Sequence, residues 1–345
     1  MAGTALEAAL SSVPIRVWEA VAPRRAFALC YHMVSDEVVP HVRPLFAYKT
    51  PGEFVEDVEY LRRRYGLVSE DGLARRLEGK DGGRRAAVAI SFDDGLKECH
   101  SVVRPILSRS GMRAVFFLTT GCLDNRAMIY RHQAALCVHR ILAAGDRERA
   151  SLFDAVNHDL KVGLVKVGDL IRLITGLRAD RSALLDEVTR LLGIDVSRYL
   201  KEHKPYLSRA QALELAADGH LLGAHGVTHR DFQVLSEQEI EEEVVQSCDT
   251  IASLAGQTPV PFAVPFTLDG LDRALLQRIR RAHPQVGWIY GTSGLRREPP
   301  GLSNRLVTDS PRGSRADHSN LPLLFRAAYA SWARTAVSPS GGKIW

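Results

Sequence analysis

The chain has 345 residues, 46% of them hydrophobic and 25% charged, which is the balance of a globular protein with a sizeable core. The formal net charge is only +5, and no block of like charges is long enough to suggest a nucleic-acid-binding tail. No apolar run approaches the ~20 residues that a membrane-spanning helix needs.

The first residues and the cysteines favour a reducing compartment. Residues 1–22 predict a helix, but Glu7, Arg16 and Glu19 interrupt the apolar stretch that a secretory signal would need. The five cysteines are odd in number and lack CxxC spacing, so we expect buried free thiols and no disulfide framework. We therefore expect a cytoplasmic protein, whose N-terminal helix packs on the domain or touches a membrane surface.

Strands and helices are expected to alternate over the first third of the chain. Apolar runs predict strands over residues 26–30, 86–92 and 114–118, and apolar residues at helical spacing predict helices between them. Gly66 and Gly111 are placed to end two of those helices. This alternation predicts a parallel sheet covered by helices.

The alternation breaks between residues 123 and 203. This stretch predicts several helices, among them 133–143 and 181–192, and one weak strand over 163–167. We expect a helical insertion. Its arginines form either a solvated basic face or a lid over an anionic substrate.

The alternation resumes at Ser208, which opens a capping box with Gln211. Strands are then predicted over residues 221–224, 262–266 and 286–290. The expected organisation is an N-terminal helix (1–22), an α/β domain in two parts (23–122 and 204–310), a helical insertion or lid (123–203) and a C-terminal segment (311–345).

Two groups of polar residues stand at the ends of predicted strands. Residues 91–95 read Ser-Phe-Asp-Asp-Gly and place two adjacent carboxylates, Asp93 and Asp94, where a sheet end usually carries neutral turn residues. His225 and His229, four positions apart, follow another strand. Two imidazoles and one carboxylate are a common catalytic zinc set that leaves positions open for water. The two groups together predict a metal site at the strand ends.

Residues 91–95 resemble the first motif of the polysaccharide deacetylase family, also called the NodB-homology group, and residues 225–229 resemble its second motif. Similar residues surround them at the places expected in that family, including Tyr31-His32 and Ala263-Val264-Pro265-Phe266. The resemblance covers residues 26–120 and 205–267. It implies an α/β fold, a distorted and incomplete (β/α) barrel, with one divalent metal ion at the strand ends.

The resemblance also implies roles for single residues. Asp94, His225 and His229 would hold the metal, which we expect to be zinc, with cobalt and iron as alternatives. Asp93 would be the catalytic base, and a neighbouring cation would keep it ionised. The backbone N–H of Phe266, at the family's tyrosine position, would help to bind the tetrahedral oxyanion.

Four further residues are expected in the pocket. His32, at a strand end, is a candidate catalytic residue and a better one than His283 or His318. Substrate contacts are expected from three positions: Tyr31, Pro265 and Arg305.

The chain departs from the family pattern at three points. Ala263 stands where many members carry the arginine that orients the base, so that support must come from elsewhere, with Arg305 and His32 as candidates. The late Leu-x-His motif, which supplies the acid to the leaving amine, is not visible. Gly226 stands where a serine is common and lacks that serine's hydrogen bond in the loop.

The expected function is metal-dependent hydrolysis of an N-acyl group, above all N-acetyl, from an amino sugar or a sugar-containing precursor. Without an export signal, a cytosolic precursor is favoured over a mature wall polymer. Two alternatives stay open: an amidohydrolase acting on a small non-sugar amide or a cyclic C–N bond, and a metal-retaining binding or scaffold protein with weak catalysis. No nucleic-acid partner is expected, and the oligomeric state is open.

Overall fold

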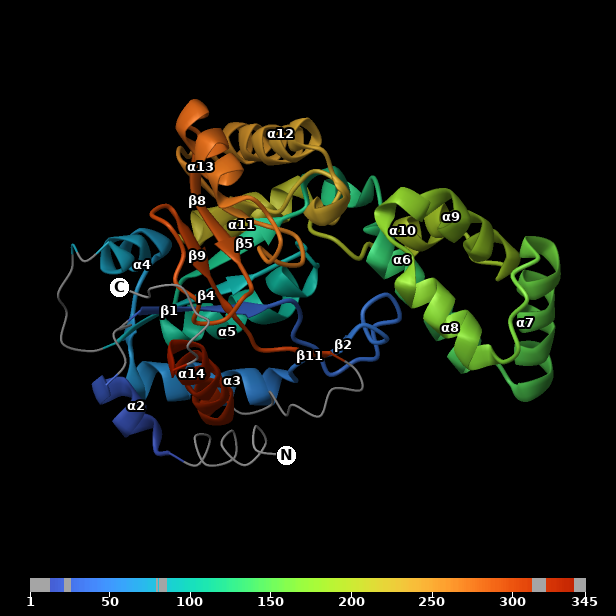
Figure 1. Ribbon diagram of the computed structural model, residues 1–345, viewed down its shortest axis with the longest axis horizontal. Coiled ribbons are helices and arrows are strands. Elements are labelled where there is room, and N and C mark those ends of the chain that lie inside the picture. The colour runs from blue at the N-terminus through green and yellow to red at the C-terminus, as the bar shows by residue number, and fades with distance from the viewer. Residues whose placement is uncertain (1–12, 22–25, 79, 81–85, 312–320, 338–345) are drawn as a thin grey trace.

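The computed structural model describes residues 13–21, 26–78, 80, 86–311 and 321–337. At its centre lies a sheet of parallel strands in the order β10-β1-β4-β5-β6-β7-β8-β9, with β3 paired to β4 beside this path (Figure 1). The expected distorted (β/α) barrel is therefore confirmed. Its strands are β1 (Ala26–Tyr31), β3 (Gly66–Leu67), β4 (Ala87–Phe92), β5 (Ala114–Leu118), β6 (Leu221–Ala224), β7 (Val260–Ala263), β8 (Val286–Gly291), β9 (Leu302–Asn304) and β10 (Leu306–Val307).

The two ends of the strand order are joined by a single residue. β9 pairs with β8, β10 pairs with β1, and only Arg305 stands between β9 and β10. The Arg305 N–H donates to the carbonyl of Gly291 at 2.9 Å. One short stretch of chain therefore borders both edges of the sheet and nearly closes the barrel. Strands this short carry no periodic signal, and they were not predicted.

The strands are buried on both sides because helices cover the barrel and small side chains fill it. Ala28 and Ala89 lie in one buried cluster with Phe117 and Tyr290. Alternate residues of the same strands, such as Phe27, belong to the main core with the covering helices. These helices are α3 (Pro51–Arg64), α4 (Glu70–Leu77), η1 (Cys99–Val103), α5 (Arg104–Ser110), α11 (Arg209–Ala217), α12 (Glu237–Ala255) and α13 (Arg273–Ala282).

One predicted strand is too long. β7 ends at Ala263, whereas the apolar run predicted a strand through Phe266. Phe266 has a φ of +65°, in the left-handed region, so the chain leaves the sheet before it. The residues after β7 therefore form a turn at the site edge of the barrel.

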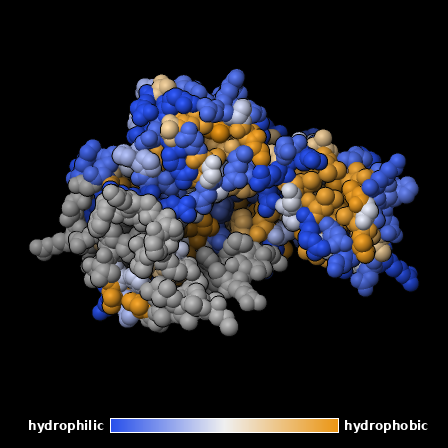
Figure 2. All heavy atoms as spheres, viewed as in Figure 1, coloured by the Kyte–Doolittle hydropathy of each residue, from blue (hydrophilic) through white to orange (hydrophobic). Residues whose placement is uncertain are grey.

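Five helices of the predicted insertion form an arm that projects from the barrel (Figure 1). The arm has its own core, which includes Cys137, Val156, Leu170 and Val188. These four side chains are fully buried among the helices of the arm, and further apolar side chains show on the face of the arm seen in Figure 2. The predicted strand over 163–167 is wrong, because a loop there leads into α8. The helices of this helical arm are α6 (Tyr130–Ala143), α7 (Asp146–Leu160), α8 (Val167–Gly176), α9 (Ser182–Leu191) and α10 (Val196–His203).

The two terminal helices pack against each other on the barrel. α2 (Ile15–Val21) places Trp18 against Tyr329 of α14 (Leu321–Val337), with ring centroids 6.0 Å apart. Phe325 of α14 meets Phe27 of β1 edge to face at 5.3 Å. The described part of the N-terminal helix thus packs on the domain, one of its two expected positions, while α14 was not predicted. A two-residue pair, β2 (Phe46–Ala47) with β11 (Ser310–Pro311), completes the described strands.

Two expectations from composition can be compared with the structure. All five cysteines are buried and free, as expected. Among the helices of the described residues, none has both the length and the apolar character needed to cross a bilayer.

Candidate active site

The predicted motifs meet at one edge of the barrel because all strands of the closed path run parallel. Asp93 and Asp94 follow β4, His32 follows β1, and His225 follows β6. The turn that contains Phe266 follows β7. Carboxyl ends of parallel strands share one edge, so these side chains converge although they are far apart in sequence.

The two adjacent aspartates have separate partners. Asp93 is anchored by its N–H, which donates to the carbonyl of Tyr31 at 2.9 Å. Asp94 has a φ of +69°, which turns the chain sharply after the strand. As a result the Asp93 carboxylate meets Arg305, while the Asp94 carboxylate meets His229.

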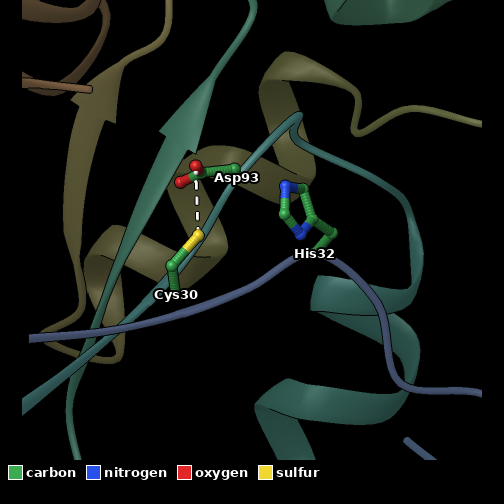
Figure 3. A group of neighbouring side chains, drawn as sticks. All are labelled: Cys30, His32 and Asp93. Carbon is green, nitrogen blue, oxygen red and sulfur yellow. Dashed lines mark hydrogen bonds between the residues drawn. The ribbon is translucent and has the colours of Figure 1, made fainter. Parts of the chain in front are cut away.

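Arg305 holds Asp93 through two parallel hydrogen bonds. Its Nη1 donates to Oδ1 at 2.6 Å and its Nη2 donates to Oδ2 at 2.7 Å. The Cys30 thiol, on the other side of the carboxylate, donates to Oδ2 at 3.3 Å (Figure 3). Burial alone would raise the pKa of Asp93, but Arg305, helped by His225, outweighs it and brings that pKa to about 2.

Arg305 thus gives Asp93 the guanidinium partner that the family pattern would place at position 263. The guanidinium lies 4.9 Å from the centre of the Phe117 ring. It reaches Asp93 from the residue between β9 and β10 and not from β7. Sequence spacing could not show this, because Arg305 and Asp93 are brought together only by barrel closure.

The structure does not support the substrate contacts expected of Arg305 and Tyr31. Arg305 is 1% exposed and its guanidinium is directed at Asp93. Tyr31 is fully buried, and its hydroxyl donates to Asp57 at 3.1 Å. Pro265 is also buried, beside Gly226 in the turn that carries the histidines.

Asp94, His225 and His229 place one ligand atom each within 4.8 Å of one another. Asp94 Oδ1 lies 3.1 Å from His229 Nε2 and 3.7 Å from His225 Nε2. His225 Nδ1 donates to the carbonyl of Ala263 at 2.8 Å, which leaves Nε2 as an acceptor facing the carboxylates. Burial lowers the pKa of His225 to about 4, so this ring is neutral at physiological pH.

This group fits a divalent metal ion. Asp94 Oδ1 is buried, and no well-aligned hydrogen bond within the described residues satisfies it. Acceptor atoms of an ionised carboxylate and a neutral imidazole lie against each other, an arrangement that a cation stabilises. The donor set suits zinc, cobalt or iron and does not discriminate among them.

A second possible metal group, Cys30 with His32 and Asp93, is drawn in Figure 3. Its carboxylate is already paired with Arg305 through both oxygens. Burial raises the pKa of the Cys30 thiol well above its usual range, whereas metal binding requires a thiolate. We therefore interpret this group as the surroundings of the base and not as a metal site.

Glu243 of α12 fixes the turn between the two histidines and was not recognised from the sequence. This buried carboxylate accepts hydrogen bonds from the N–H groups of Val227 at 2.6 Å and Thr228 at 3.0 Å, and from the Thr228 hydroxyl. The residue at 226 has a φ of +74°, and a Cβ there would lie 2.9 Å from Glu243 Oε2. Gly226 is therefore required by the turn, which explains the absence of the family's serine.

Replacing Gly226 with serine should lower the free energy of unfolding by about 1–2 kcal/mol, the cost of a left-handed backbone for a residue with a Cβ. Chemical denaturation measures this loss. Gly145→Ser is the matched control, because its φ is −65° and nothing lies within 4 Å of a Cβ there. Equal stability of the Gly226→Ser variant and the wild type would contradict this account of the turn.

His32 forms a pair with Asp309, which follows β10. Asp309 Oδ2 lies 2.8 Å from His32 Nδ1 and accepts the His32 backbone N–H at 2.8 Å. Burial would lower the pKa of His32, but the hydrogen bond with Asp309 and the charge of Asp94 raise it to about 9. Asp309 was not predicted as a site residue, because the two-residue strand before it, β10, has no periodic signal.

Phe266 and His132 lie at the site, whereas His283 lies on the surface. The Phe266 ring lies 5.1 Å from that of His229. His132, on the helical arm, was not predicted, yet its Nε2 lies 3.5 Å from Asp94 Oδ2. His283 pairs with Glu241 at 2.7 Å on the surface, and His318 lies outside the described residues.

A nearly closed parallel barrel with acidic and imidazole groups at its carboxyl edge places this chain in the class of distorted (β/α) barrels with a polar site at the strand ends. Residues 190–284 match the family model described as polysaccharide deacetylase. This match confirms the resemblance recognised from the sequence and supports the enzyme class that the resemblance implies, a hydrolase of carbon–nitrogen bonds. The matched residues include both metal-site histidines.

Solved structures with the same fold are similar to this chain at low identity. The Streptococcus pyogenes deacetylase PplD, in complex with acetate, is 15% identical with a TM-score of 0.52, over 82% of this chain and 91% of that one. IcaB from Ammonifex degensii is 15% identical with a TM-score of 0.52, over 87% of this chain and 97% of that one. No curated protein sequence matched.

Proposed function

We propose that the protein is a metal-dependent N-deacetylase that acts on an N-acetylated amino sugar. One observation carries this proposal: Arg305 holds Asp93 as an ionised carboxylate beside the group formed by Asp94, His225 and His229. Asp93 is paired with Arg305, and Asp94 lies with His225 and His229, so the proposed base and the proposed ion-binding set are separate groups within one site.

The two titratable groups outside the ion-binding set have complementary protonation states. Asp93, with its pKa near 2, is ionised at neutral pH and can accept a proton from water. His32, with its pKa near 9, is protonated and can donate to the leaving amine. A divalent ion held by Asp94, His225 and His229 would polarise the acyl carbonyl and acidify a water molecule.

Phe266 is proposed to assist through its backbone. Its N–H, in the left-handed turn after β7, would donate to the oxyanion that forms as water adds to the acyl carbon. One such donor typically contributes ~2.7–4 kcal/mol to transition-state stabilisation.

The structure offers substitutes for the two absent residues that favoured a binding or scaffold protein with weak catalysis. That alternative rested on the absent arginine at position 263 and the absent late histidine. Arg305 contacts the base from another strand, and His32 with Asp309 offers a protonated imidazole beside it. Both observations support catalysis.

The substrate is proposed to be a sugar carrying an N-acetyl group. Support comes from the polysaccharide deacetylase match and from the fold shared with PplD, a deacetylase solved with acetate. A sugar-containing precursor and a cytoplasmic location remain our proposals, and a panel of substrates of different length distinguishes a precursor from a polymer.

The test combines metal analysis with turnover. The wild type should bind one equivalent of Zn²⁺ and release amine from N-acetylated sugars, nucleotide-linked sugars or sugar oligomers. Asp94→Asn should lose the metal, whereas Asp93→Asn should keep the metal and lose turnover by 10²-fold or more. Full activity in Asp93→Asn would remove Asp93 from the role of base, and release only from small non-sugar amides would favour the amidohydrolase alternative.

A further inference from the structure

The helical arm supplies a side chain that neither motif contains. His132 lies on α6, is 1% exposed, and has its Nε2 3.5 Å from Asp94 Oδ2, the outer limit of a hydrogen bond. We propose that His132 is a positioning residue, which donates an N–H to Asp94 Oδ2 and directs Oδ1 toward His225 and His229. This inference rests on the proposed function, because it concerns the carboxylate of the ion-binding set.

The hydrogen bonds of Tyr206 favour one ring nitrogen of His132 as the carrier of the proton. The Tyr206 hydroxyl oxygen accepts the N–H of Ile129 at 3.0 Å and lies 2.8 Å from His132 Nδ1. The hydroxyl proton is therefore available to Nδ1, which accepts it. In a neutral ring the proton then sits on Nε2, the nitrogen that faces Asp94.

Two aromatic rings pack against His132. Tyr206 stacks on it with centroids 5.7 Å apart, and Asn125 fixes the Tyr206 backbone through bonds of 2.8 and 3.1 Å. His41 meets the ring edge to face at 5.5 Å and is itself held by the Tyr199 hydroxyl at 2.9 Å. Tyr199 belongs to α10, so the first and last helices of the arm both contact the His41 ring.

The two oxygens of Asp94 consequently have different surroundings. Oδ1 faces His229 Nε2 at 3.1 Å and His225 Nε2 at 3.7 Å, and Oδ2 faces His132. An outer donor on one oxygen orients a carboxylate ligand, and loss of such a donor typically weakens metal affinity by 10–100-fold. His132 would thus make ion binding depend on the helical arm.

Zinc affinity tests this dependence in the full-length chain. Dissociation constants for Zn²⁺, measured by competition with a chelator, should rise 10–100-fold in His132→Asn, whose amide reaches only the place of Nδ1. His132→Gln, whose amide can reach the place of Nε2, should restore most of the affinity. His139→Asn, on the same helix and about two turns further along, should bind like the wild type. Wild-type affinity in His132→Asn would overturn the inference.

A second measurement needs no metal. Nitrogen-15 NMR of the metal-free wild type, with the His132 signals assigned by their absence from His132→Asn, should show the ring protonated at Nε2. Tyr206→Phe should shift this signal toward a mixture of tautomers. Protonation at Nδ1 in the wild type would overturn the inference. A wild type that binds no Zn²⁺ but keeps the proton on Nε2 would refute the proposed ion-binding set and support the contact between His132 and Asp94.

Discussion

Replacing Arg305 with methionine should destabilise the protein by about 3–5 kcal/mol at pH 7, because it leaves the buried Asp93 carboxylate without its partner. Denaturant unfolding measures this loss. Arg296→Met is the matched control: Arg296 forms an exposed ion pair with Asp269, and exposed pairs contribute only ~0–1 kcal/mol. Arg305→Lys keeps the charge but not the two parallel hydrogen bonds, so its loss of stability should lie between those of Arg305→Met and Arg296→Met.

The pH dependence of this loss has a definite sign. In the wild type the pKa of Asp93 is about 2, below its ordinary value of 3.8, so the ion pair stabilises the fold above pH 3.8 and that stability is lost as the pH falls toward 2. Without the guanidinium, burial raises the pKa of Asp93 instead. The stability deficit of Arg305→Met should therefore shrink as the pH is lowered, and the acidic limb of kcat/KM should move to higher pH. A deficit below 1 kcal/mol with an unmoved limb would show that Arg305 does not hold the base.

Replacing Asp309 with asparagine should move the basic limb of kcat/KM downward by about 1–2 pH units. The wild-type pKa of His32 is about 9, and the general acid must be protonated, so activity falls as the pH rises through that value. Hydrogen bonds to charged groups contribute about 1.5–3 kcal/mol, or one to two units of pKa. Asparagine keeps an oxygen acceptor for His32 but removes the charge.

The stability of Asp309→Asn provides an independent check. Because the folded pKa of His32 lies above its ordinary value of 6.5, the stabilisation from the pair is fully present below pH 6.5 and is lost as the pH rises through about 9. The variant should therefore be destabilised more at pH 6 than at pH 10. Asp36→Asn, at an exposed position in the loop after His32, is the control and should change neither the limb nor the stability. If the basic limb of kcat/KM is unchanged in Asp309→Asn, His32 is not the general acid whose loss of a proton causes that limb.

The helical arm was predicted as an insertion, but its connection to the site was not. Hydrophobic spacing identifies helices such as α6 and α9, because that signal is local to each segment. It does not show that His132 of α6 reaches Asp94, since this contact depends on how the arm packs beside the barrel. A histidine among apolar residues is also no signal of a site by itself.

The sequence by itself determined the strands with long apolar runs and the two motifs that end them. Asp93 and Asp94 were expected to follow β4, and His225 to follow β6, because apolar stretches of four to six residues have the length of a buried strand and are too short for a typical helix. Only the tertiary structure decided what holds these side chains in place. Arg305 lies between β9 and β10, and Asp309 lies shortly after β10. These strands of two or three residues have no local signal, and they exist because each finds a partner at an opposite edge of the barrel.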